Sequence, residues 1–176
     1  KVTAYVEIFF KLLFDQELFG GRHAHEVIEK LDQSILKEAF VALYHDRESL
    51  LYLSTPALNF LYLAERFSGR VLAVSPEYLH TVLTEQVWRH EDSVELHARI
   101  YFATHAIINA SSFYQHEIEA TYRDVYTQTL KYAEELIIRN FAQVSLDQKF
   151  EFMVCCRLLG YSSLLDTAIR QEALHS

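Results

Sequence analysis

Apolar residues recur every three to four positions along almost the whole chain, which is the spacing of one face of an α-helix. Such stripes run through residues 2–18 and 24–44, and through the segments 54–69 and 74–90. Further stripes cover about 93–117, 119–142, 145–159 and 162–175. The pattern predicts about eight helices joined by short turns.

Start and stop residues support several of these helices. A serine or threonine just before a helix accepts a hydrogen bond from a backbone N–H that has no partner within the helix. Candidate caps of this kind are Ser54 or Thr55, Ser75, Ser145 and Ser162. Pro56 and Pro76 fall in the first turn, where proline is tolerated, and Gly69 follows the end of a helix.

The composition agrees with a helical fold. Only four glycines and two prolines occur in 176 residues, too few for the frequent tight turns of a β-sandwich or barrel. This length fits one domain, and no segment resembles a long linker. We therefore expect a single all-α domain over residues 1–176, built from antiparallel αα-hairpins as a bundle, a short solenoid or an incomplete α/α toroid.

A shift of fifty residues aligns several similar positions. It places Arg99 on Lys149, Phe102 on Phe152 and Leu96 on Leu146, together with Glu85 on Glu135. Repetition at this period would make each unit a helical hairpin. The alternative is that two amphipathic helices align by chance.

The charge distribution limits the partners. The formal net charge is −8, and no run of lysine and arginine interrupts it, so the basic surface of a nucleic-acid or anionic-membrane binder is missing. The two longest uncharged runs, 49–64 and 100–115, are too short and too polar to span a bilayer. A protein, a peptide or a small molecule remains as partner.

The cysteines predict a reducing environment. The only two are neighbours, Cys155 and Cys156, in an apolar segment, and adjacent cysteines cannot staple a fold. We expect buried, unreactive thiols and a cytoplasmic location.

One polar stripe stands out in the uncharged segment 100–115. On a continuous helix its members fall within an arc of about 80°. They are Tyr101, His105, Asn109, Ser112 and His116. Polar groups without formal charge suit a buried or pocket-lining face, where each must find a partner. The stripe is either a core hydrogen-bond network between helices or the lining of a ligand pocket centred on His105.

Signatures of metal or cofactor chemistry are weak. Two Glu-x-x-His pairs, Glu77/His80 and Glu172/His175, suggest a di-metal bundle, but their helices should place them at opposite poles. The common nucleotide, hydrolase and zinc motifs are absent from the sequence. We therefore assign no catalytic residue, no metal ligand and no particular cofactor.

The segment "ATHAIINASSFYQ", residues 103–115, resembles the motif T-H-x-x-F-x-x-T-D-F-G of an uncharacterised all-helical bacterial family. Thr104 and His105 match its T-H, whereas Ser111 and Phe113 match its second T and second F. Ser112 and Tyr114 replace its D and G, so the role of that ending does not carry over. The resemblance implies a helical fold and no known activity.

Two functions follow from these features. The first is a non-catalytic helical domain that binds a peptide, a protein partner or an apolar small ligand in an inter-helix groove. The second is an enzyme, metal-assisted or not, that uses His105. Because symmetric dimers are common, a homodimer through the apolar helix at residues 2–14 is a further expectation.

Overall fold

Every regular element in the described residues, 32–68, 71–86 and 93–175 of the computed structural model, is helical. They comprise seven α-helices and one short 3-10 helix, which confirms the predicted all-α class. The expected helix over 2–18, with the proposed dimer contact at 2–14, lies outside the described residues. The chain divides into two compact units, Lys1–Val74 and Ser75–Ser176, and each is described by itself. The single domain over 1–176 stays a prediction.

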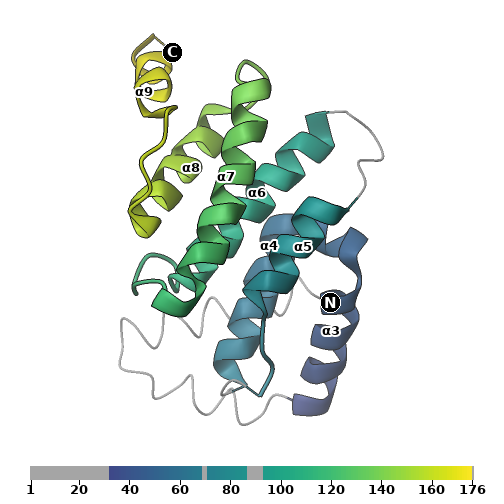
Figure 1. Ribbon diagram of the computed structural model, residues 1–176. Helices are drawn as coiled ribbons and strands as arrows, with labels where there is room; N and C mark the ends of the chain where they lie inside the picture. Colours follow the sequence, from purple (N-terminus) through teal and green to yellow (C-terminus); the bar gives the residue numbers. More distant parts are fainter. Residues whose placement is uncertain (1–31, 69–70, 87–92, 176) are drawn as a thin grey trace. The chain divides into compact units, whose positions relative to one another are not determined.

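The first unit contains α3 (Gln33–His45) and α4 (Arg47–Phe67), which pack against each other (Figure 1). Asp32 caps α3 by accepting hydrogen bonds from the backbone N–H groups of Ser34 and Ile35. Helix α3 begins at Gln33, after this cap, and covers the described part of the helix predicted over 24–44; residues 24–31 of that prediction lie outside the described residues. Its buried stripe is Leu36, Phe40 and Leu43.

Helix α4 is two helical segments joined at a kink. Ser54 has φ 27° and ψ −93°, outside the helical region, and Pro56 follows two residues later. Inside a helix, proline removes one backbone donor, its ring clashes with the carbonyl four residues earlier, and it disfavours the helical conformation of the residue just before it. The predicted helix start at Ser54 or Thr55 is therefore a break inside a longer helix, because residues 47–53 are helical as well.

The second unit contains α5 (Pro76–Glu85), α6 (Ser93–Ala110), the 3-10 helix η1 (Ala120–Tyr122), α7 (Arg123–Arg139), α8 (Leu146–Leu159) and α9 (Asp166–His175). Helix α6 packs against α5, α7 and α8, and α7 packs against α5 and α8 (Figure 1). Ser75 and Ser145 cap α5 and α8, as predicted, by accepting the backbone N–H groups of Tyr78 and Gln148. Helix α9 contacts α8.

Contacts between α5 and α7 and between α6 and α8 join residues about fifty positions apart. His80 of α5 meets Thr129 of α7 at 3.0 Å, and Thr104 of α6 meets Glu151 of α8 at 2.9 Å. Contacts between α6 and α8 advance along both helices in the same direction, so the two helices are parallel. The fifty-residue repetition itself stays a prediction.

Two buried cations occupy equivalent positions in that period. Arg99 is fully buried and donates to Glu95 (2.8 Å) and to the backbone carbonyls of Leu83 (2.6 Å) and Gln86 (2.8 Å). It thereby ties the C-terminal end of α5 to α6. Fully buried Lys149 pairs with Glu172 of α9 at 2.7 Å and lies 3.9 Å from the centre of the Phe141 ring.

A buried carboxylate fixes the loop between α8 and α9. Glu134 of α7 accepts hydrogen bonds from the Tyr161 hydroxyl (2.6 Å), the Ser163 hydroxyl and the backbone N–H of Leu164 (3.2 Å). Its hydrogen bond, together with burial, raises the pKa of Tyr161 to about 12. These bonds hold the loop outside helical geometry. Helix α9 therefore begins at Asp166, and the prediction that Ser162 caps a helix is wrong.

Candidate functional site

The predicted polar stripe is only partly helical. Tyr101, His105 and Asn109 lie on α6, but the helix ends at Ala110, so Ser112 and His116 do not continue its face. The predicted helix over about 93–117 is therefore too long. Ser112 is partly exposed and His116 is exposed in the turn that follows.

A left-handed turn ends α6. Ser112, Phe113 and Tyr114 have φ angles of 50°, 55° and 72°, which non-glycine residues rarely adopt. The Ser111 hydroxyl accepts the backbone N–H of Tyr114 at 3.0 Å and donates to the carbonyl of Ile108 at 2.7 Å. Ile118, four residues beyond this turn, is buried. The helix therefore ends in a left-handed turn that contains neither glycine nor proline.

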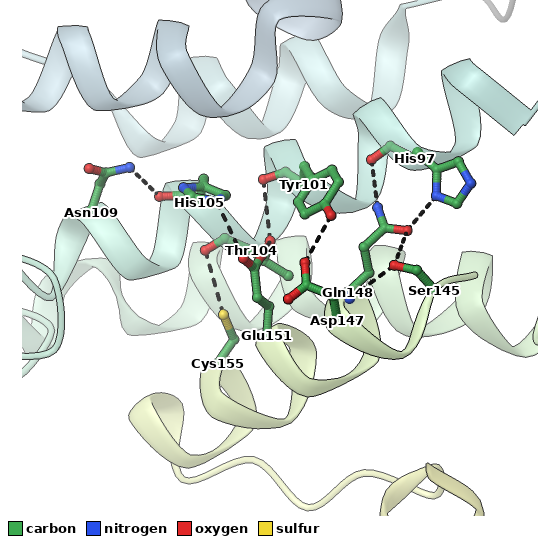
Figure 2. Close-up of polar contacts among 10 residues, drawn as sticks. All are labelled: His97, Tyr101, Thr104, His105, Asn109, Ser145, Asp147, Gln148, Glu151 and Cys155. Carbon is green, nitrogen blue, oxygen red and sulfur yellow. Dashed lines mark hydrogen bonds and ion pairs between the residues drawn. The ribbon is translucent and has the colours of Figure 1, made fainter. Parts of the chain in front are cut away.

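Two of the remaining members of the stripe, Tyr101 and His105, face α8. We call the α6–α8 seam the set of side chains that bond across these two helices. It consists of His97, Tyr101, Thr104 and His105 of α6, with Asp147, Gln148, Glu151 and Cys155 of α8 (Figure 2). The stripe thus meets a second helix whose polar residues the sequence analysis did not select.

The centre of the seam is a histidine–carboxylate pair. Nε2 of His105 lies 3.6 Å from Oε1 of Glu151, which is longer than a hydrogen bond, and the side chains are 14% and 23% exposed (Figure 2). The Thr104 hydroxyl donates to Oε2 of the same carboxylate at 2.9 Å. Burial acts to raise the pKa of Glu151, but His105 and the Thr104 hydroxyl outweigh it, and the pKa is lower than usual. Glu151 is therefore an ionised carboxylate at neutral pH.

A second pair of side chains, Tyr101 and Asp147, joins the two helices one helical turn away. The Tyr101 hydroxyl donates to Oδ2 of Asp147 at 3.0 Å, and the ring centres of Tyr101 and His105 are 6.2 Å apart. Burial, and then the bond to Asp147, raise the pKa of Tyr101. Its phenol is therefore a neutral donor at neutral pH.

The end of the seam nearest the α8 N-terminus is closed by an amide. Gln148 is fully buried, and its side-chain nitrogen donates to the backbone carbonyl of His97 at 3.0 Å. Its side-chain oxygen contacts Nδ1 of His97, and the Ser145 hydroxyl donates to that oxygen at 3.3 Å (Figure 2). These hydrogen bonds join the two helices at this end of the seam.

The other end is closed by Asn109 and Cys155. The Asn109 side chain donates to the backbone carbonyl of His105, one turn back on the same helix, at 2.7 Å. The Cys155 thiol donates to the carbonyl of Thr104 at 3.5 Å. Burial, and then the charge of Glu151, raise the pKa of Cys155 well above its usual value. Burial is also the main cause that raises the pKa of Cys156 to about 12. Both thiols are free and buried, as expected.

The two Glu-x-x-His pairs are engaged elsewhere. Glu77 accepts from the hydroxyl of Ser75 at 2.9 Å, and His80 contacts Thr129. Glu172 pairs with Lys149, while Nδ1 of His175 lies 2.7 Å from the carbonyl of Gln171. Within the described residues, no group of three or more histidine, cysteine, aspartate and glutamate side chains is arranged to hold a metal ion.

The sequence analysis missed the α8 half of the seam. Asp147 and Glu151 are four residues apart and therefore share one face of α8, but charged residues at this spacing are also typical of a solvated helix. The fifty-residue period was the available signal, because it superposes α6 and α8. It could not show that the two helices touch.

Comparison with protein-family models, with curated proteins and with solved structures found no match to this chain. The resemblance of residues 103–115 to a helical bacterial family therefore stays a prediction. None of the helices in the described residues is long and apolar enough to cross a membrane.

Proposed function

We propose that this protein is a non-catalytic helical domain that binds a peptide or a protein partner between its helical hairpins. The supporting observation is which groups the side chains of the polar stripe contact. Its helical members bond to α8 or to their own helix, and they do not converge on a common point where a substrate atom could sit. A convergent arrangement is what acid–base or nucleophilic catalysis requires.

The orientation of His105 also favours binding over catalysis. In a histidine–carboxylate dyad the carboxylate holds one ring nitrogen, and the other nitrogen transfers the proton to or from the substrate. Here Nε2 faces Glu151, and Nδ1 is buried without a hydrogen-bond partner in the described part of the chain. A substrate from solvent would not reach that nitrogen.

A stacked pair of similar hairpins is a common scaffold for binding polypeptides, because successive hairpins build an extended surface. The adjacent buried thiols suit a reducing compartment, so we place this function in the cytoplasm.

The proposal is tested by selection from a random twelve-residue peptide library displayed on phage, with the full chain immobilised. We expect enrichment of a sequence family that binds the chain in solution with a dissociation constant of about 1–100 μM, typical of short peptides ordered on binding. Repeated selection without any enriched family would contradict the proposal.

A second candidate is an enzyme that uses the His105–Glu151 pair, because both side chains are partly exposed and of the types that transfer protons. Native mass spectrometry followed by denaturing mass spectrometry of the purified chain tests this candidate. An excess mass that is lost on denaturation and is absent from the His105→Gln variant would favour it.

A further inference from the structure

We propose that helix α9 is an internal, displaceable occupant of the polypeptide-binding surface, and that a partner helix with the same two apolar residues and one carboxylate binds in its place. The surface is the face of α8 that α9 covers, with Lys149 as its charged centre. This inference rests on the proposed peptide-binding function and names the surface, the chemistry of the partner and the regulation of binding.

The first argument is that α9 is attached through few buried groups. Of its ten residues only Ile169 is buried, which is fewer than in any other described α-helix. Leu165, just before the helix, is buried as well, whereas Leu164 and Leu174 are 88% and 83% exposed. Elements with few buried apolar contacts open locally while the rest of a domain stays folded. A helix this short also depends on its tertiary contacts, because it is marginally stable alone in water.

The second argument is the buried cation beneath α9. Nζ of Lys149 donates to both carboxylate oxygens of Glu172, at 2.8 Å and 2.7 Å, and lies 3.9 Å from the centre of the Phe141 ring. Lys149 is fully buried, but the Glu172 side chain is 35% exposed. A buried ammonium requires a counter-charge. Because the cation belongs to α8 and the carboxylate to α9, a helix that replaces α9 must supply a carboxylate at this point.

The third argument is the spacing of the groups by which α9 binds. Leu165, Ile169 and Glu172 follow one another at i, i+4 and i+7 and therefore share one face of the helix. Amphipathic helices of polypeptide partners use the same spacing when they dock in grooves. Helix α9 lies against α8 in this way (Figure 1). Its own sequence thus defines the partner, an amphipathic helix whose apolar face ends in an acidic residue.

The fourth argument is the anchor before α9. Glu134 accepts hydrogen bonds from the Tyr161 hydroxyl at 2.6 Å and from the backbone N–H of Leu164 at 3.2 Å. These bonds are made before α9 begins at Asp166, so they persist when the helix leaves α8. A segment held by a short tether competes at an effective concentration of about the millimolar range. A partner therefore binds only against this competition, and α9 is autoinhibitory.

The first part of the test measures the opening of α9 by hydrogen exchange of the full chain with mass spectrometry. We expect α9 amides to be at least about tenfold less protected than those of α6 and α7. Ile169→Asp, which places a charge at the buried anchor, should abolish protection in α9 alone, whereas the matched control Gln171→Ala changes an exposed residue of the same helix and should leave protection within about threefold. If Ile169→Asp removes protection from α5 to α8 as well, Glu172→Gln replaces it.

The second part measures binding of a fluorescein-labelled peptide of residues 163–175 by fluorescence anisotropy. The Ile169→Asp chain should bind this peptide at least about fivefold more tightly than the parent chain and the Gln171→Ala control, because its own α9 no longer competes. Glu172→Gln in the peptide should weaken binding by about fivefold or more. Adding Lys149→Gln to the Ile169→Asp chain should remove the gain, and circular dichroism verifies that each variant folds.

The other outcomes separate this inference from the proposed function. Protection of α9 equal to that of α7, or equal binding of the peptide to the parent and Ile169→Asp chains, would overturn the assignment of α9. If the peptides enriched on phage still bind the parent chain but do not compete with the peptide of residues 163–175, only the inference about α9 falls. Failure to enrich any family, together with no binding of the peptide of residues 163–175, would overturn both.

Discussion

Replacing His105 and Glu151 singly and together measures how much their contact contributes to the fold. The double-mutant cycle consists of His105→Ala, Glu151→Gln and the double variant, and the coupling free energy is the part of the destabilisation that is not additive. If the seam is a network that holds α6 to α8, this coupling is stabilising whenever both groups are charged.

The magnitude follows from the geometry. Two unit charges 3.6 Å apart attract each other by about 1 kcal/mol in bulk water and by about 5 kcal/mol at an effective dielectric constant of about 20. Because the side chains are 14% and 23% exposed, solvent screens part of this energy, and we expect a coupling of about 1–3 kcal/mol.

The assay is urea unfolding followed by far-UV circular dichroism at neutral pH. The exposed pair Glu135–Arg139 gives the control cycle, with an expected coupling of at most about 0.5 kcal/mol.

The pH dependence of stability tests the contribution of the Glu151 carboxylate separately. Since the folded-state pKa of Glu151 is lowered, its stabilisation is fully present above the ordinary carboxyl range and is lost as the pH falls through the lowered value. The stabilities of the parent chain and Glu151→Gln should therefore converge at low pH. A seam coupling no larger than that of the control pair would refute the role that we assign to the contact.

Three further predictions concern the parts of the fold that surround the seam. Arg99→Met should lower the free energy of unfolding by about 3–5 kcal/mol, because it removes the guanidinium that pairs with the buried Glu95 carboxylate, and adding Glu95→Leu should recover part of this loss in urea unfolding; a loss below about 1 kcal/mol would contradict it. The pKa of Tyr161, raised to about 12 chiefly by its bond to Glu134, should fall toward the usual tyrosine value in Glu134→Gln, as measured by ultraviolet titration. Because that pKa is raised, the bond stabilises the fold below about pH 10, and this stabilisation is lost as the pH rises through about 12; an unchanged titration would show that the bond is absent. The two buried thiols should resist Ellman's reagent at pH 8 and react only after unfolding in guanidinium, whereas rapid reaction of either thiol in the native chain would show that it is exposed.

The sequence by itself determined the helical class and several helix starts. Helical periodicity and local caps depend on neighbours within about four residues, so Ser75 and Ser145 could be predicted as caps from the sequence. Burial of the two cysteines was predictable for the same reason, because they lie in an apolar segment. These features require no knowledge of which helices touch.

Tertiary structure decided where helices stop and which polar groups meet. Helix α6 ends at Ala110 in a left-handed turn, and α9 begins late because Glu134, about thirty residues earlier, binds the loop before it. The polar stripe was visible in the sequence, but its partners Asp147 and Glu151 were not. Their role depends on the parallel packing of α6 and α8, and contacts across about fifty residues of chain are set by how whole helix faces fit together.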